Sequence, residues 1–151
     1  NLFSQKKLSE LQVLKEKIEN SIRQKNLQNI IKFYGSTKKM NLIYALSDIV
    51  ISSSTDPEAF GRVSIEAQAM GKLIIASAHG GSQETILEGK TGYLYSPKNP
   101  FELMEKISSA IDQKTYSSNE MSASAIEHIK SNYGKDKMCK KTLEFYQEII
   151  G

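Results

Sequence analysis

At 151 residues the chain is long enough for one domain with a sizeable core, and its composition is that of an ordinary globular protein. A net charge of +3 is too small to argue for a nucleic-acid partner. The single cysteine, Cys139, excludes an internal disulfide and fits a reducing compartment, and no apolar run approaches the length of a transmembrane helix. We therefore expect a cytoplasmic protein. Because the chain begins with Asn1 rather than Met, we expect it to be processed, cut from something longer or only partly represented.

The first predicted element is an amphipathic helix over residues 4–25. Its apolar residues recur at helical spacing, and they are Leu11, Leu14, Ile18 and Ile22. Lysine and glutamate lie elsewhere on the helix, and its basic surface consists of Lys6, Lys7, Lys15, Lys17, Arg23 and Lys25. This basic surface fits a solvated face, and contact with an anionic membrane surface stays open as the alternative.

A strand and a short helix are predicted next. Ile30–Tyr34 has the β-branched and aromatic composition of a strand, which Gly35 ends. Residues 38–47 form a short helix with Leu42, Ile43 and Leu46 facing inward.

The central stretch, from Asp48 to Thr85, predicts a strand, a loop, a helix and a second strand. The strands are the β-branched runs Ile49–Ile51 and Leu73–Ala76. The loop contains the turn Asp56-Pro57-Glu58, and the alanine-rich helix after Arg62 stops at Gly71. This order is the repeating unit of a parallel sheet.

The rest of the chain predicts one more strand among helices. We expect a helix over Gln83–Glu88, a strand over Tyr93–Tyr95 and a helix that starts at Asn99-Pro100. Two further helices follow, near residues 118–132 and 136–150. The buried face of the last one is predicted to carry Met138, Thr142, Phe145 and Ile149.

The central helix places a carboxylate beside apolar residues. At 100° per residue one stripe of this helix carries Val63, Glu66, Ala67 and Met70, and the solvated side carries Ser64 and Gln68. A buried carboxylate is costly unless its oxygens accept hydrogen bonds. Either a protein donor or a ligand must therefore satisfy Glu66.

The position of this helix favours a ligand that contains a nucleotide. In open parallel sheets, ligands bind beyond the carboxyl ends of the strands, next to helix N-termini. Free amides around Phe60, Gly61 and Arg62 would form an anion site there, and Gly61 has no Cβ to block a close approach. A carboxylate such as Glu66 suits a vicinal diol, which ribose has. The residues thus favour a nucleotide or nucleotide-sugar site.

Several spaced motifs resemble one family. Glu58-x7-Glu66, with Phe60-Gly61 between the carboxylates and Ala67-x-Ala69-x-Gly71 after them, resembles the signature of the retaining GT-B glycosyltransferases of family four, the glycosyl transferases group 1. The likeness runs over about residues 5–150. It includes Ile30–Gly35, Leu73–Ala76, His79-Gly80-Gly81 with Glu84, and Gly89-x-Thr91-Gly92-Tyr93-Leu94.

The resemblance implies an α/β fold. It implies a Rossmann-like parallel sheet flanked by helices, the C-terminal, donor-binding half of a GT-B enzyme, as a single N-terminally truncated domain over residues 1–151. The strands would be the third to the sixth, and the first two would be absent. A gap would then lie between Ile30–Tyr34 and Ile49–Ser52, which upstream sequence or another chain must fill.

The resemblance also implies roles for individual residues. Glu58 would contact hydroxyls of the donor sugar as the catalytic residue, and Glu66 would bind the ribose diol. The other implied donor-binding residues are Phe60, Gly61, Arg62, Val63, Tyr34 and Gly35. Arg62 could instead be a solvated arginine. Tyr34, which relatives place near the nucleobase, could instead be a core tyrosine.

Other chemistry finds little support. His79 has no second His, Asp or Cys at metal-ligand spacing, so we expect no metal and interpret His79 as a loop residue that supports the site. Two carboxylates could also serve a glycosidase, but one lies in the loop and the other along the helix, and the family pattern assigns both to donor binding.

The resemblance therefore implies a hexosyltransferase-type enzyme of cell-envelope polysaccharide biosynthesis. The full enzyme would move a sugar from a nucleotide-diphosphate sugar to an acceptor hydroxyl with retention, without a cofactor. An acceptor glycan or lipid would bind through a missing N-terminal domain, at the inner face of the membrane in one alternative. This chain alone would be inactive. A non-catalytic nucleotide-sugar-binding module and an epimerase of the same fold stay as alternatives.

Overall fold

The computed structural model describes residues 2–150, with side chains from residue 10 onward. The chain divides into two compact units, Asn1–Lys38 and Lys39–Gly151, and each is described by itself. Among the described residues no helix has the length and apolarity needed to cross a membrane.

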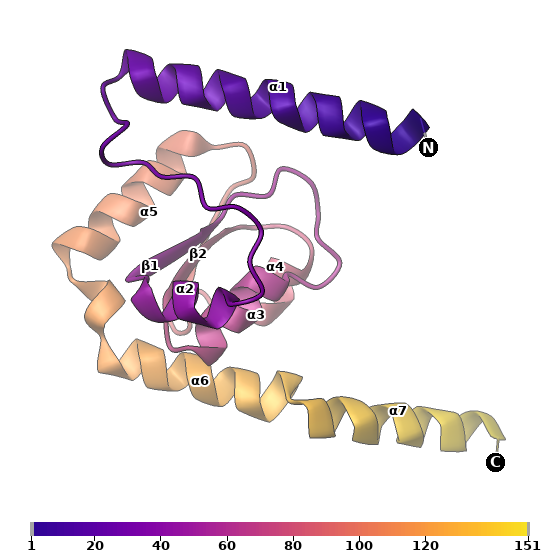
Figure 1. The fold of residues 1–151 in the computed structure, drawn as a ribbon. Helices are drawn as coiled ribbons and strands as arrows, with labels where there is room; N and C mark the ends of the chain where they lie inside the picture. The colour runs from indigo at the N-terminus through magenta and orange to yellow at the C-terminus, as the bar shows by residue number, and fades with distance from the viewer. Residues whose placement is uncertain (1, 151) are drawn as a thin grey trace. The chain divides into compact units, whose positions relative to one another are not determined.

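The first unit is one long helix followed by irregular chain (Figure 1). Helix α1, Leu2–Gln24, confirms the helix predicted over 4–25. Of its predicted apolar stripe, Ile22 is buried, whereas Leu11, Leu14 and Ile18 are exposed. The helix thus forms as predicted, but most of the described stripe is exposed.

The strand predicted over Ile30–Tyr34 is wrong, because these residues lie in a turn and irregular chain. The amides of Ile30 and Ile31 both donate to the carbonyl of Leu27, at 3.0 and 2.9 Å. These local bonds take up donors that a strand would give to a neighbouring strand. Composition alone suggested a strand, but a strand also needs a partner.

The second unit is built on a parallel sheet of three strands in the order β1-β2-β3. The strands are β1, Ile49–Ser52, β2, Leu73–Ser77, and β3, Tyr93–Tyr95, and all three confirm sequence predictions. Residue Ile49 pairs with Leu73, and Ile75 pairs with Tyr93. Among the described residues β1 pairs with β2 alone and lies at one edge of the sheet, so the gap expected beyond that edge, on the side of Ile30–Tyr34, stays a prediction.

Helices cover both faces of this sheet (Figure 1). Alternate residues of β2 point to opposite faces, so Ile74 packs in one core cluster and Ile75 in the other. The first cluster joins α2 (Met40–Leu46) and α3 (Arg62–Ala69) to the sheet, and the second joins α5 (Pro100–Asp112). The remaining elements are α4 (Gly81–Thr85), η1 (Thr115–Ser117), α6 (Asn119–Tyr133) and α7 (Lys135–Ile150).

Helix α2 corrects the predicted inward face of residues 38–47. Tyr44 is the buried residue, whereas Leu42 and Leu46 are exposed and Ile43 is half-buried. A helix of seven residues has barely two turns, so several rotations about its axis fit its apolar residues equally well. Packing on α3 and the sheet selects the one that buries the aromatic ring.

Helix α3 corrects the predicted solvated side of the central helix. Ser64 and Gln68 are fully buried, and Met70 is exposed. Helix α6 packs on α3, and α4 contacts the side that sequence periodicity assigned to solvent, where the hydroxyls of Ser64 and Ser82 lie 3.4 Å apart. Gln68 Nε2 donates to the carbonyls of Ser64 and Thr85, at 3.1 and 2.9 Å. Polar residues are thus buried here because their hydrogen bonds are made inside the protein.

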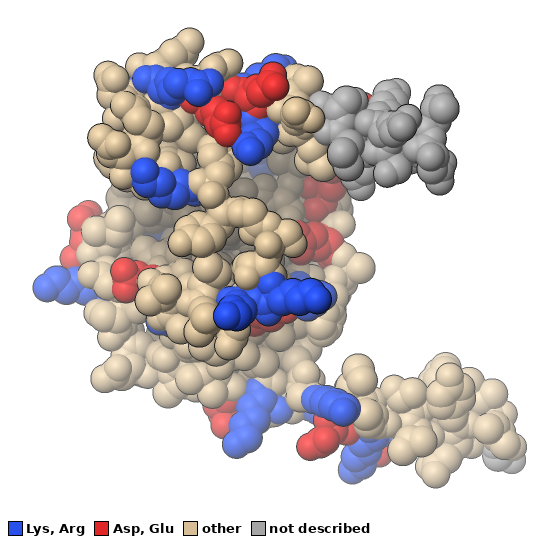
Figure 2. All heavy atoms as spheres, viewed as in Figure 1, with Lys and Arg blue, Asp and Glu red and all other residues tan. Residues whose placement is uncertain are grey.

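Helices α4 and α7 also differ from the predictions. Helix α4 spans Gly81–Thr85 instead of Gln83–Glu88. Helix α7 forms where expected, but its predicted buried face is exposed, with Met138, Phe145 and Ile149 each about 60% accessible. Figure 2 shows mostly uncharged surface along the far part of α7, and mixed charges over the body of the second unit.

Candidate functional site

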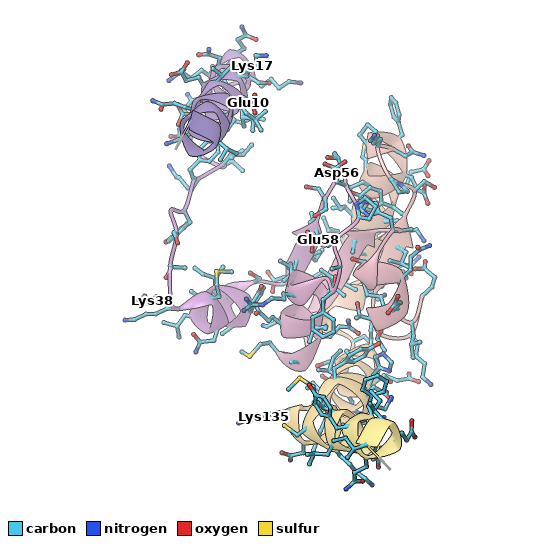
Figure 3. All side chains as sticks on the ribbon, turned by 90° about the vertical axis from the view of Figure 1, so that its right-hand side faces the viewer. Glu10, Lys17, Lys38, Asp56, Glu58 and Lys135 are labelled. Carbon is cyan, nitrogen blue, oxygen red and sulfur yellow. The ribbon has the colours of Figure 1, made fainter. Side chains whose placement is uncertain are left out.

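Two loops meet at the carboxyl edge of the sheet. The first follows β1 and carries Glu58, and the second follows β2 and contains His79-Gly80-Gly81. Because β1 and β2 are parallel neighbours, their carboxyl ends lie side by side. Figure 3 shows Asp56 and Glu58 on the loop after β1. This is the edge where the sequence predicted a site.

The glycine pair lets the two loops touch through their backbones. Gly81 N donates to the carbonyl of Glu58 at 2.8 Å. A Cβ on Gly80 would lie 2.4 Å from that same carbonyl oxygen, and a Cβ on Gly81 would lie 2.4 Å from the carbonyl carbon of Phe60. Any side chain here would therefore push the loops apart. The pair holds the backbone of Glu58 in place.

The carboxylate of Glu58 is held by a second contact. The hydroxyl of Ser54 donates to Glu58 Oε1, and His79 Nε2 lies 2.8 Å from the carbonyl oxygen of Ser54. A carbonyl only accepts, so His79 must carry its proton on Nε2. Glu58 itself is half-buried.

The start of α3 offers backbone donors beside this loop. Gly61 precedes the helix with a φ of 66°, a conformation that favours glycine, and no side chain caps the helix. The carbonyl of Gly61 accepts from the amides of Ser64 and Ile65. The amides of Arg62 and Val63 precede the first helical hydrogen bonds and have no acceptor within the helix. Phe60 is 53% exposed.

Glu66 differs from its prediction, because its carboxylate is half-exposed and protein groups already donate to both oxygens. Arg62 Nη2 lies 3.0 Å from Oε1, and the Tyr44 hydroxyl lies 3.0 Å from Oε2. The Arg62 side chain is 82% exposed and the Glu66 side chain 36% exposed. The sequence argument left open whether a protein donor or a ligand satisfies Glu66, and in this structure Arg62 and Tyr44 do so.

The pKa of Tyr44 depends in part on its contact with Glu66. Burial, the hydrogen bond to Glu66 and the negative charge of that carboxylate raise the pKa of Tyr44 to about 12, while Arg62 acts in the opposite direction. The Tyr44 hydroxyl therefore stays a donor to Glu66 at neutral pH.

Tyr34 and Gly35 lie outside the unit that contains Glu58 and Glu66. Both belong to the first unit, where they lie in irregular chain, and Tyr34 is 82% exposed. Their predicted part in binding a nucleobase stays a prediction.

Sequence reasoning missed Ser54, Tyr44 and Tyr133. The Tyr133 ring packs edge-on against Phe60, with centroids 6.2 Å apart, and its hydroxyl donates to the carbonyl of Glu84 at 2.8 Å. Burial and the charge of Glu84 raise the pKa of Tyr133. Tyr133 follows Glu84 by 49 residues, so no local pattern could have linked them.

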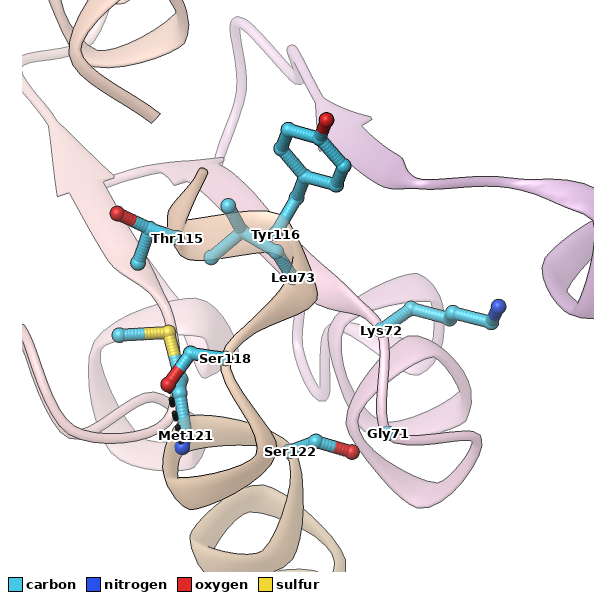
Figure 4. A pocket seen from close by; sticks show the side chains of 8 residues that line it. All are labelled: Gly71, Lys72, Leu73, Thr115, Tyr116, Ser118, Met121 and Ser122. Carbon is cyan, nitrogen blue, oxygen red and sulfur yellow. Dashed lines mark hydrogen bonds between the residues drawn. The ribbon is translucent and has the colours of Figure 1, made fainter. Parts of the chain in front are cut away.

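A small pocket lies at the opposite edge of the sheet, where β2 begins. Figure 4 shows it between the Gly71–Leu73 segment and residues of η1 and the start of α6. A neighbouring cavity of about 120 Å³ extends it toward Ser47 and Asp48. Neither takes in a predicted site residue. Within the described part of the chain, no group of three His, Cys, Asp or Glu residues is arranged to hold a metal ion.

Comparison with known families decides the family. The sequence pattern described as "Glycosyl transferases group 1" matches residues 12–131. The chain belongs to this family. The match covers both strand-loop segments of the site, and it agrees with the resemblance carried by Glu58, Glu66 and the glycine pair.

Similar proteins agree with this membership. Spore coat protein SA of Bacillus subtilis (strain 168) is 30% identical over 126 residues, which are 83% of this chain and 33% of that protein. A glycosyltransferase from Rickettsia africae ESF-5 has a TM-score of 0.82 and 36% identity, over 90% of this chain and 36% of that one. Anabaena HepE, solved in complex with UDP, has a TM-score of 0.85 and 26% identity, over 91% and 37% of the two chains.

The fold prediction is confirmed: a Rossmann-like parallel sheet flanked by helices, as in the C-terminal half of a GT-B glycosyltransferase. The group 1 chain spans about a third of the length of these three relatives.

Proposed function

We propose that this chain is the donor-binding half of a glycosyltransferase that moves a sugar from a nucleoside-diphosphate sugar to an acceptor hydroxyl. The observation that carries the proposal is the loop of Glu58, fixed by the glycine pair beside the open start of α3. A related structure contains UDP, and family membership supports the transfer reaction. Retention of configuration and transfer of a hexose are proposed from the resemblance.

In this proposal the two carboxylates bind different parts of the donor. Glu58 accepts hydrogen bonds from the sugar hydroxyls and positions the sugar for transfer. The backbone amides from Phe60 to Val63 face the sugar and the diphosphate, whose negative charge a helix N-terminus favours.

Glu66 accepts the ribose diol in this proposal. One diol hydroxyl takes the place of Arg62 at Oε1, and the released guanidinium turns toward a phosphate, which its planar fork matches. The exchange costs little, because an exposed pair within one helix contributes only about 0–1 kcal/mol. Tyr44 keeps Oε2 oriented throughout.

The first test is a binding measurement, because the donor contacts proposed above all lie in this chain. Calorimetry with UDP, GDP and ADP, and then with matching nucleotide sugars, separates nucleotide binding from the additional affinity given by the sugar. We expect Glu66→Gln to weaken binding of the preferred nucleotide about 10-fold or more, since charged hydrogen bonds are worth about 1.5–3 kcal/mol. Glu58→Gln should remove the sugar's contribution and leave nucleoside-diphosphate affinity unchanged.

Asp56→Asn is the matched control, because it removes the same charge from an exposed position two residues before Glu58. In the full-length enzyme Glu58→Gln should lower kcat about 100-fold, since misplacing a reactant costs that order. Unchanged donor binding and turnover in both glutamate variants would contradict the proposal. Tight binding with no transfer in the full-length protein would favour a non-catalytic nucleotide-sugar-binding module.

A further inference from the structure

His79 contacts the loop of Glu58 at the carbonyl oxygen of Ser54. Its Nε2 proton can only be donated to the Ser54 carbonyl, at 2.8 Å, and the Ser54 hydroxyl in turn donates to Glu58 Oε1. Two hydrogen bonds therefore connect the imidazole to the carboxylate that is proposed to hold the sugar.

The other contacts of the loop fix different atoms. Gly81 N binds the carbonyl of Glu58, and the glycine pair packs on the backbone of Glu58 and Phe60. These contacts place the main chain, but they do not determine where the Glu58 carboxylate points. Among the described residues, Ser54 is the group that donates a hydrogen bond to this carboxylate and orients it.

His79 also has a ring nitrogen that lowers the stability of the fold. Its Nδ1 is buried and has no hydrogen-bond partner among the described residues. An unsatisfied buried acceptor costs about 1–3 kcal/mol, which the hydrogen bond made by Nε2 has to offset. The imidazole is accounted for by its donor at Nε2, which reaches the Ser54 carbonyl.

We propose that His79 is a positioning residue, which orients the Glu58 carboxylate toward the donor sugar through Ser54. The inference rests on the proposed function, because it takes Glu58 as the residue that contacts the sugar. It gives the first residue of the His79-Gly80-Gly81 motif a different task from the two glycines. The histidine orients the side chain, and the glycines place the backbone.

Four variants of the full-length enzyme test the proposal. His79→Gln keeps an N–H donor near the Nε2 position, whereas His79→Asn is too short to present it and His79→Leu has none. Ser54→Ala removes the hydroxyl and leaves the histidine. We expect His79→Asn, His79→Leu and Ser54→Ala to lower kcat about 10-fold with nucleoside-diphosphate affinity unchanged, and His79→Gln to stay within about threefold of wild type.

Combination with Glu58→Gln separates positioning from a general loss of structure. If His79 acts through Glu58, His79→Asn should lower kcat no further in the Glu58→Gln background. Thermal unfolding of each variant identifies any that does not fold. Should His79→Leu unfold, His79→Asn and His79→Gln carry the test. Nitrogen-15 NMR of this chain should show the proton of His79 on Nε2.

The failures of the two proposals can be told apart. A loss of kcat in Glu58→Gln together with full activity in His79→Asn, or with an additive loss in the double variant, would overturn the positioning role and leave the proposed function intact. A proton on Nδ1 would overturn it too. Full activity in Glu58→Gln would remove the proposed function and the positioning role with it.

Discussion

Glu58 and Glu66 stand eight residues apart, but contacts of different kinds hold their carboxylates. Packed backbone and the small side chain of Ser54 hold Glu58, while the long and exposed side chain of Arg62 and the buried Tyr44 hold Glu66. The first arrangement is formed before any ligand arrives. In the proposed function, the second exchanges one donor for another with little cost. One site thus combines a preformed half with an adaptable half.

The largest effect is expected where the loop of Glu58 is packed most tightly. Gly80→Ala should destabilise the fold by about 3 kcal/mol or more, because the new Cβ meets backbone and the residue must keep a φ of 55°. Gly89→Ala is the control, because Gly89 has a φ of 73° but open space around it. Urea denaturation should show a loss of only about 1–2 kcal/mol for this control. Equal losses in both variants would mean that crowding does not fix the loop.

A smaller loss of stability is expected when Tyr133, which packs beside the same preformed half, is substituted. Tyr133→Ala removes the ring that packs on Phe60 and the hydrogen bond to Glu84, so we expect a loss of about 2 kcal/mol. Tyr133→Phe keeps the ring and should lose about 1 kcal/mol. Urea denaturation measures both losses. If the two variants lost the same amount, the ring would add nothing to the support of the loop.

In the adaptable half around Glu66, the contribution of the buried Tyr44 to stability should depend on pH in alkaline solution. The pKa of Tyr44 is raised to about 12 in the folded state, above the value of about 10 of an unfolded chain. Its contribution to stability is complete below pH 10 and is lost as the pH rises toward 12, because the unfolded chain then releases the proton first. Tyr44→Phe should remove this part of the decline in a pH series of thermal unfolding. An unchanged decline would assign it to other groups.

The smallest effect is expected at Arg62. Arg62→Gln should change the free energy of unfolding by about 0.5 kcal/mol or less, because the pair with Glu66 is exposed and lies within one helix. Lys140→Gln, which breaks the exposed pair of Lys140 with Glu144 at the same spacing in α7, is the matched control. Urea denaturation at low and high salt compares the two. A loss of 2 kcal/mol at Arg62 alone would show that Glu66 is held as firmly as Glu58.

Sequence predicted the parts of the site that local pattern encodes. The order of β1, the loop, α3 and β2 followed from β-branched runs and from glycine at the helix end. The position of Glu58 and the glycine pair at one edge followed from the rule that parallel strands share a carboxyl edge. The surroundings of each carboxylate did not follow. Tyr44 lies 22 residues before Glu66, and His79 lies 25 residues after Ser54.

By itself, then, the sequence determined which segments become helices or strands at most positions, because hydrogen bonding and side-chain periodicity act over a few residues. Only the tertiary structure decided which helix faces are covered. Ser64 and Gln68 of α3 are buried with hydrogen-bond contacts to α4, while α7 leaves Phe145 exposed, although periodicity predicted the reverse in both helices. The physical reason is that a period identifies a face, and the packing of distant segments determines whether that face meets protein or water.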